Sequence, residues 1–438
     1  MTQARRVRLD GWGLYLWLLI GLIPVVVPNG PARTAIVDLL IVLGFGAFAV
    51  TWLTKRERIH VPFFGPVLAI SVGSILAVVN AVSPGASFVA MAQDAYLYLW
   101  FIMVVHLLRR RDLDGIRVTW VWFACAIAAL GVVSLVTDAH LSLIDLARPT
   151  GRRAFGTFYD PNMFASYLVM SLFMLISLGD RMGRMLRWGA CGILLLALVA
   201  TKSNGGMLSL AGGLTVWAVV RGWTRTVSPM ALAAGTLIAV SVVLTGVWLI
   251  LGLGVGSSQL SSLEQESFLA RASHSSEGRF KIWGQLQHTY AKTPLGIGPG
   301  NSRWTTMSVE TRVRKDGLTS KEAHNDYLAY AIERGPLALL GLLAMLAQAF
   351  AKLAGAWRRR DEPGARGSSM GPLVAGLAGA LVAACIHALT IEVLHYRHFW
   401  MLLAIVCSVE GVRERGRAEQ PGSLEDPLGL PDARVAAA

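Results

Sequence analysis

Charged residues are scarce in this chain of 438 residues. Asp, Glu, Lys and Arg make up 15% of the sequence, against roughly 25% in an ordinary soluble domain. Hydrophobic residues make up 54%, which is more apolar surface than one soluble core can bury. A lipid bilayer is the solvent that accepts the remainder. The composition therefore excludes an ordinary soluble domain and indicates an integral membrane protein.

Motifs for several common chemistries are absent. The four cysteines lie inside apolar segments and have neither a disulfide framework nor metal-ligand spacing. No Gly-x-x-x-x-Gly-Lys-Ser/Thr loop is present, which excludes a P-loop ATP site, and no Gly-x-Ser-x-Gly nucleophile elbow is present. The Asp112-x-Asp114 pair lies in an arginine-rich segment, where salt bridges are expected instead of a metal site. The sequence predicts no metal and no cofactor.

The net charge of +13 is not explained by nucleic acid, because no run of basic residues is interleaved with exposed aromatics. Apolar segments long enough to cross a membrane, or nearly so, recur along the chain instead. They predict an all-α polytopic membrane protein with about twelve transmembrane helices, at 12–28, 33–53, 61–80, 88–107, 117–137, 161–179, 186–201, 204–221, 229–252, 326–351, 371–391 and 396–412.

Lys and Arg are distributed unequally between alternate loops. One set of loops and helix ends contains 23 of them, at 5–8, 55–58, 109–117, 181–187, 221–225, 352–366 and 413–417. The short segments of the other set contain six: Arg33, Arg148, Arg152, Arg153, Lys202 and Arg397. Because Lys and Arg accumulate in cytoplasmic loops, the first set is predicted to be cytoplasmic. Both termini are then predicted to be cytoplasmic.

Four regions follow from this topology. Residues 1–252 form transmembrane helices 1–9, and residues 326–412 form helices 10–12. Between them, residues 253–325 form a periplasmic loop with short helices. Residues 413–438 form a cytoplasmic tail, polar and disordered from about 418.

The long periplasmic loop contains an amphipathic helix, in which Phe280, Trp283, Gln287 and Tyr290 recur near helical spacing. Arg279 and Lys281 lie in its first turn, where cations oppose the helix dipole. A bound anion reverses that effect, because backbone N–H groups and the guanidinium then both face it. The pattern favours a phosphate site; an exposed arginine on a solvated helix face is the alternative.

A second candidate is His324-Asn325-Asp326, just before the tenth predicted span, which continues with Glu333-Arg334-Gly335. An imidazole with an ordinary pKa of about 6.5 is mostly neutral at neutral pH and can accept a proton from a hydroxyl. The alternative is that His324 caps the helix by bonding to nearby backbone.

Two shorter motifs are predicted on the same side of the membrane. Residues 156–162 end in Pro161 and Asn162, which suit a helix start, and follow Arg152 and Arg153. Residues 201–206 form a tight turn between two spans, in which Lys202 is exposed to anions.

These outward motifs together resemble the bacterial O-antigen ligase and polymerase superfamily. The similarity runs from about 150 to 340. The residues that carry it are Gly156-Thr157-Phe158, Asp160-Pro161-Asn162, Thr201-x-Ser203-x-Gly205, Arg279 with Trp283, Pro294-Leu295-Gly296-x-Gly298, His324-Asn325 and Glu333-x-Gly335. The length of the chain looks most like the lipopolysaccharide O-antigen ligase.

The resemblance implies a GT-C-like enzyme that moves O-antigen polysaccharide from undecaprenyl diphosphate to lipid A–core oligosaccharide at the periplasmic face. It implies an inverting, metal-independent mechanism with His324 as general base and Arg279 on the diphosphate. Lys202, Arg152, Arg153 and Lys281 are the further diphosphate-binding candidates. The supporting residues are Asn325, Asn204, Pro161, Asn162 and Glu333.

The chain departs from the family at Asn204, where the family often has Arg. Lys202, Arg152 or Arg153 is expected to supply the missing charge. An O-antigen polymerase and a protein O-oligosaccharyltransferase are the nearest alternatives. A lipid-linked glycan transporter is the alternative from another class, with Asp94, Glu333, His387 and Glu392 as its few ionisable candidates within spans.

Overall fold

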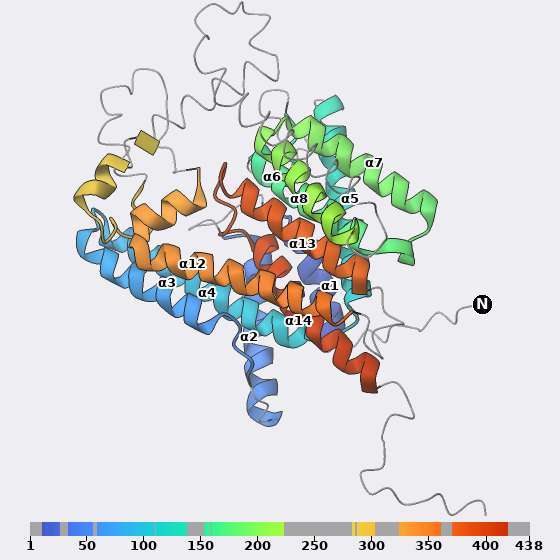
Figure 1. The fold of residues 1–438 in the computed structure, drawn as a ribbon, viewed down its shortest axis with the longest axis horizontal. Helices are drawn as coiled ribbons and strands as arrows, with labels where there is room; N and C mark the ends of the chain where they lie inside the picture. The colour runs from blue at the N-terminus through green and yellow to red at the C-terminus, as the bar shows by residue number, and fades with distance from the viewer. Residues whose placement is uncertain are drawn as a thin grey trace, which may run out of the picture.

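The computed structural model describes residues 11–26, 34–55, 59–109, 111–137, 153–158, 160–222, 283–284, 287–302, 324–360 and 370–418. Within these ranges the chain is helical and contains no β-strand (Figure 1). The helices are α1 (Gly11–Leu22), α2 (Ile36–Lys55), α3 (Phe64–Ala77), η2 (Val78–Asn80), α4 (Pro84–Arg109), α5 (Leu113–Thr137), α6 (Pro161–Ser177), η3 (Gly179–Arg181), α7 (Arg184–Thr201), α8 (Asn204–Gly222), α12 (Asp326–Arg358), α13 (Met370–His387) and α14 (Arg397–Ala418).

The all-α polytopic fold predicted from the sequence is confirmed. Eleven of the twelve predicted spans overlap a helix of the described residues; residues 27–28 and 33, at the ends of two of these spans, lie outside the described residues. Six described helices are long and apolar enough to cross a membrane, and four shorter apolar helices accompany them. The predicted span 229–252 lies outside the described residues. The closely spaced α7 and α8 are separate helices, with Lys202 in a left-handed conformation between them.

Close helix packing brings distant parts of the chain together. α12 packs along α3, α13 packs along α8, and α14 packs along α4. Glycine permits the closest approaches: a Cβ on Gly73 of α3 would lie 2.8 Å from the backbone nitrogen of Ala338, and one on Gly213 of α8 would lie 2.6 Å from the carbonyl oxygen of Gly379. Small residues at such contacts let membrane helices associate through backbone proximity. In Figure 1, α13 lies between α8 and α12.

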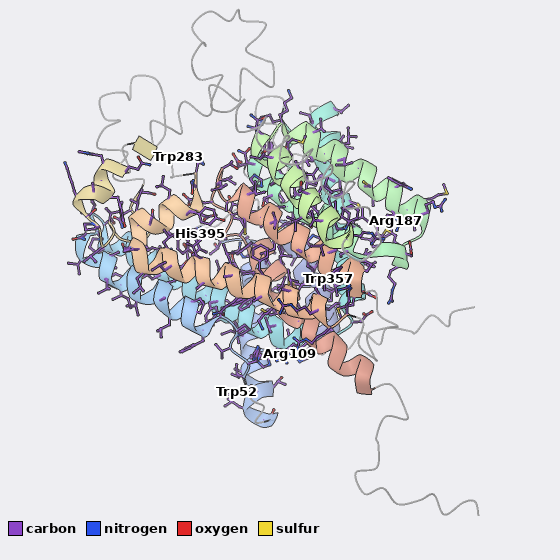
Figure 2. All side chains as sticks on the ribbon, in the orientation of Figure 1. Trp52, Arg109, Arg187, Trp283, Trp357 and His395 are labelled. Atoms are coloured by element: carbon purple, nitrogen blue, oxygen red, sulfur yellow. The ribbon has the colours of Figure 1, made fainter. Side chains whose placement is uncertain are left out.

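Apolar side chains also cover outer faces of the bundle. Leu39 and Leu43 of α2 and Trp188 and Val199 of α7 are more than half exposed. Figure 2 shows such side chains projecting from the ribbon, with Trp52 labelled on α2. In a bilayer these faces are covered by lipid tails, so their exposure is not a defect of the core.

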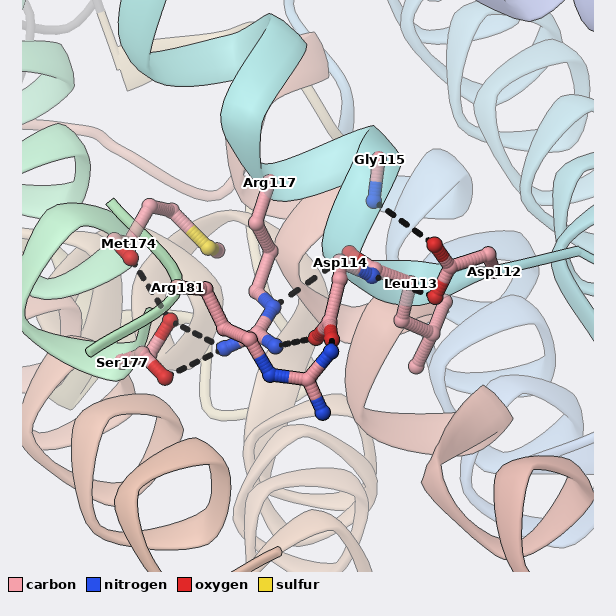
Figure 3. A network of polar contacts seen from close by, with 8 residues as sticks. All are labelled: Asp112, Leu113, Asp114, Gly115, Arg117, Met174, Ser177 and Arg181. Carbon is pink, nitrogen blue, oxygen red and sulfur yellow. Dashed lines mark hydrogen bonds and ion pairs between the residues drawn. The ribbon is translucent and has the colours of Figure 1, made fainter. Parts of the chain in front are cut away.

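One end of the bundle contains a buried ionic network (Figure 3). The side chain of Arg117 in α5 is fully buried and donates to the backbone oxygen of Ser177 (2.5 Å) and to its hydroxyl (2.9 Å) at the end of α6. Asp114 forms ion pairs with Arg117 and with Arg181, the latter at 2.7 Å. The expectation that Asp114 forms salt bridges is therefore confirmed. The network lies at the arginine-rich end, which is predicted to face the cytoplasm.

α6 runs from this network to the opposite end of the bundle, where the candidate site residues lie. In Figure 2, Arg109, Arg187 and Trp357 lie toward the arginine-rich end, and Trp283 and His395 lie toward the other. At the C-terminus, α14 continues to Ala418, and the rest of the predicted tail lies outside the described residues. Most of the predicted periplasmic loop 253–325 also lies outside them.

Candidate functional site

The site begins at the N-terminus of α6. Asp160 is its N-cap: the carboxylate accepts hydrogen bonds from the backbone N–H of Asn162 (2.6 Å) and Met163 (3.3 Å). Pro161 occupies the first helical turn, as predicted, because its missing N–H needs no partner there. This cap fixes the position of the Asn162 side chain, which serves as an acceptor for two other segments.

Arg153 is one of the two donors to Asn162. Its Nη2 donates to Asn162 Oδ1 (3.3 Å), and its Nε donates to the carbonyl oxygen of Thr201 (2.8 Å) at the end of α7. The backbone N–H of Ala154 also donates to Ala200 O (2.9 Å). Arg153 therefore lies beside the turn that contains Asn204. Of the three cations expected to replace the family arginine, the structure brings Arg153 to this turn and Lys202 is part of it. Arg152 lies outside the described residues.

The second donor to Asn162 is Ser203, in the turn between α7 and α8. Ser203 Oγ donates to Asn162 Oδ1 (2.8 Å) and accepts from the backbone N–H of Gly206 (3.2 Å). Lys202 precedes it with φ +50°, a left-handed conformation that is uncommon for a residue with a side chain. Asn204 is the first residue of α8. A cationic residue thus stands immediately before a helix N-terminus, where the backbone dipole favours anions.

The end of α13 connects this turn to α12. Gly205 of α8 packs against Thr390 and His387, leaving no room for a Cβ. Next to them, the carbonyl oxygen of Ala388 accepts a hydrogen bond from the backbone N–H of Asp326 (2.9 Å), the first residue of α12. The N-terminal ends of α6, α8 and α12 therefore meet at one end of the bundle, joined by direct contacts.

His324 lies at the N-terminal end of α12 and has φ +51°, which like that of Lys202 is left-handed. Asn325 is the N-cap: its Oδ1 accepts from the backbone N–H of Leu328 (3.0 Å). The cap position is therefore filled by Asn325 and not by His324. Strained backbone of this kind costs of order 1–3 kcal/mol and collects at functional sites. His324 and Lys202 are two of three such non-glycine residues within the described part of the chain.

A second polar cluster surrounds a break in α12 at Gly335, where φ is +78° and ψ is 177°. There the Glu333 carboxylate accepts from the backbone N–H groups of Gly300 (2.8 Å) and Ser302 (2.9 Å). The backbone N–H of Ile297 donates to Ile332 O (2.9 Å). The glycine-rich turn at the end of the predicted periplasmic loop helix is therefore bonded to the broken helix, and Figure 1 shows α12 changing direction.

Residues of η2 and of the start of α4 bind the same turn. Asn80 donates to Gly296 O (3.1 Å), and buried Asn301 accepts from the backbone N–H of Ser83 (2.8 Å) and donates to Ser87 Oγ (2.8 Å). Sequence analysis missed these residues. Asn301 follows directly on the glycine-rich turn, and that position is the only signal the sequence offered.

The predicted amphipathic helix of the loop is partly described: residues 283–284 and 287–292 are helical. Trp283 and Tyr290 pack against a small core formed by Ile297, Ala329 and Ile332. Its predicted apolar face is confirmed there. Arg279 and Lys281 lie outside the described residues, so their roles stay predictions.

Glu333 supports the loop and does not join the cluster around Arg153. It lies seven residues beyond Asp326, roughly 10 Å along the helix. The following residue, Arg334, is buried and forms an ion pair with Asp94 of α4 and a hydrogen bond to Ser74 Oγ (3.0 Å). Asp94 and Glu333, two of the ionisable residues expected of a transporter, are thus both bonded to other parts of the fold.

No group of three or more His, Cys, Asp or Glu side chains within the described ranges could bind a metal ion. The fold and this arrangement define a class: a polytopic helical membrane protein with a polar, cationic site where several helix N-termini meet. Residues 189–343 match the family model described as O-antigen ligase. The match covers less than half of the chain, includes Lys202, Asn204, His324 and Glu333, and supports a similarity to the O-antigen ligase and polymerase superfamily, whose members are glycosyltransferase-like membrane enzymes. No curated protein matches the chain.

Proposed function

We propose that the protein is an O-antigen ligase. It transfers O-antigen polysaccharide from undecaprenyl diphosphate to a hydroxyl of lipid A–core oligosaccharide at the periplasmic face of the bacterial inner membrane. The observation that carries the proposal is the position of Arg153, which joins the start of α6 to the α7–α8 turn beside Lys202. The connected end of α12 adds His324 to the same end of the bundle.

The cationic groups suit the leaving group. Cleavage of the bond between the sugar and the diphosphate develops negative charge on the diphosphate, and fixed donors aimed at that charge stabilise the transition state. A guanidinium has five N–H donors, enough to bind the turn and contact a phosphate as well. The N-terminus of α8 favours the same charge. Arg279 and Lys281 of the loop are proposed to complete this set.

His324 is proposed to accept the proton of the incoming hydroxyl. In a direct displacement the acceptor oxygen attacks the anomeric carbon as the diphosphate leaves, so the sugar configuration inverts. A base within hydrogen-bond reach of that hydroxyl typically contributes 10²–10⁴-fold. The Asn325 cap, with the bond from Asp326 to Ala388, gives His324 a defined position at the start of α12.

The contacts of Asp94 and Glu333 argue against transport. Ionisable residues within the spans of transporters bind substrate or relay protons. Here Asp94 is paired with Arg334, and both Glu333 oxygens accept from backbone N–H groups of the turn. Each carboxylate is stabilised by a partner that it would have to leave during a transport cycle.

The experiment is transfer in vitro with purified protein in lipid nanodiscs. The donor is undecaprenyl-diphosphate-linked glycan, and the acceptor is rough lipopolysaccharide or none, with EDTA present and nucleotide absent. Glycan on the lipopolysaccharide is the expected result. Lengthening of the glycan on the carrier without acceptor would indicate a polymerase, and transfer to a protein acceptor alone would indicate a protein O-oligosaccharyltransferase. No covalent change, together with movement of the lipid between leaflets, would indicate a transporter.

A further inference from the structure

Asp326 has a buried carboxylate, one oxygen of which accepts no hydrogen bond. The residue is fully buried, and Oδ2 accepts from the backbone N–H groups of Val393 (2.6 Å) and Leu394 (3.1 Å) in the α13–α14 connection. Oδ1 has no hydrogen-bond partner. A buried carboxylate is costly unless it is paired with a cation or fully hydrogen-bonded. The geometry therefore requires a partner for Oδ1.

That partner is His395. Its Nδ1 lies 3.9 Å from Asp326 Oδ1, and its side chain is 37% exposed. The other nearby cation, Arg334, is already paired with Asp94. His395 is thus a partly exposed imidazole, a side chain that can carry positive charge, next to a fully buried carboxylate.

The position of His395 places that charge at the proposed site. Asp326 is only two residues from His324, and extended backbone spans at most about 7 Å over two residues. The backbone N–H of Asp326 donates to the carbonyl oxygen of Ala388. Close to Ala388 in the chain, Thr390 packs against Gly205, which closely follows the α7–α8 turn that contains Lys202. Figure 2 labels His395 beside the first half of α12. The histidine belongs to the same end of the bundle as Arg153 and His324.

Resting on the function proposed above, we infer that His395 is a further diphosphate-contacting residue and that Asp326 is its positioning residue. Asp326 acts in two ways: Oδ2 orders the backbone before His395, and Oδ1 stabilises the imidazolium. The cationic ring then contacts the diphosphate of the lipid carrier. His324 has a different role, since it accepts the proton of the incoming hydroxyl. His395 and Asp326 are therefore expected to affect donor binding, and His324 the proton transfer.

The test measures binding of undecaprenyl diphosphate, with uncharged undecaprenol as reference, to the full-length protein in nanodiscs. His395→Gln is expected to weaken diphosphate binding about tenfold and leave undecaprenol binding unchanged. His395→Arg is expected to remain within about threefold of wild type, because it keeps the charge. His288→Gln is the control, since His288 is an exposed imidazole on the periplasmic loop helix. In transfer assays the His395→Gln effect should appear in the donor KM more than in kcat.

Two variants separate the charge of Asp326 from its backbone contacts. Asp326→Asn keeps an oxygen that can accept from Val393 and Leu394 but removes the charge, and should bind as weakly as His395→Gln. The double variant Asp326→Asn/His395→Arg should bind like His395→Arg alone, because arginine stays charged without a carboxylate. A double variant as impaired as Asp326→Asn would show that Asp326 only orders backbone, and would overturn the positioning role.

The remaining outcomes distinguish this inference from the proposed function. Wild-type protein that transfers glycan while His395→Gln binds diphosphate normally would overturn the role of His395 and leave the ligase intact. Wild-type protein that neither prefers undecaprenyl diphosphate over undecaprenol nor transfers glycan would overturn both. Variants are compared only where they elute with wild type in size-exclusion chromatography; His395→Arg provides the charge test should His395→Gln fail to fold.

Discussion

Gly335 lies against the backbone of Leu295: a Cβ on Gly335 would be 2.5 Å from the Leu295 carbonyl oxygen. This contact joins the break in α12 to the glycine-rich turn that follows the helix of residues 287–292. It also explains why residue 335 has to be glycine: a side chain there would collide with the backbone of Leu295, 40 positions earlier in the chain.

Gly335→Ala should therefore lower both stability and transfer. The alanine would have to adopt a conformation that only glycine occupies readily, at a cost of order 1–3 kcal/mol. It would also displace the turn bonded to Glu333. Thermal unfolding in detergent and glycan transfer measure the two effects. Gly65→Ala is the matched control, because Gly65 in α3 has open space around it, and equal stability of the two variants would contradict the prediction.

His324→Ala should abolish transfer, with a loss of about 10²–10⁴-fold, while membrane insertion and elution stay normal. The α12 cap belongs to Asn325, so removing the imidazole leaves the helix start intact. Lipopolysaccharide from cells that express the variant is examined for attached glycan. Glycan at the wild-type level would remove His324 from the mechanism.

Arg153→Ala should reduce transfer more than it reduces stability, by about tenfold or more, because it removes both a proposed phosphate contact and the link between α6 and the α7–α8 turn. Arg153→Lys should recover only part of the activity, since lysine lacks the planar fork of donors. Arg187→Ala is the control: Arg187 also bonds to a backbone oxygen, that of Gly179 (2.5 Å), but at the arginine-rich end. Equal loss in the two alanine variants would mean that bonding to the backbone, and not the site, is responsible.

Asp94→Leu should destabilise the fold by about 3 kcal/mol or more, because it leaves the buried Arg334 guanidinium without its anion. Asp94→Leu/Arg334→Leu should recover much of that stability and retain transfer, since neither residue is proposed to touch substrate. Thermal unfolding and transfer are measured on both variants. A stable double variant without activity would show that Asp94 or Arg334 contributes to function.

Glycan transfer should be unchanged by EDTA, because the proposed charge stabilisation comes from Arg153, Lys202 and the loop cations. The assay uses nanodiscs, whose integrity after EDTA is confirmed by size-exclusion chromatography. Loss of transfer that Mg²⁺ or Mn²⁺ restores would contradict the metal-independent mechanism.

Helix positions were predictable because apolar segments of span length have few alternatives in a bilayer. Every predicted span that falls within the described residues is a helix, including the closely spaced α7 and α8. The start of α6 was predictable because it depends on neighbouring residues alone: Pro161 suits the first turn of a helix whatever that helix packs against. Charge alone made Arg153, Lys202 and Arg152 candidates for the missing family arginine. Sequence spacing did not show that Arg153 contacts the α7–α8 turn.

The sequence by itself determined that this is a helical membrane protein, which end of it is rich in arginine, and that His324 and a few cations belong to the opposite end. The tertiary structure decided which of those residues meet. Arg153 reaches Thr201 across 48 positions, Asp326 reaches Val393 across 67, and Arg334 reaches Asp94 across 240. Hydrophobicity sets the depth of each segment in the bilayer, whereas partners around the bundle depend on how side chains of different helices pack, and that information is not local to any segment.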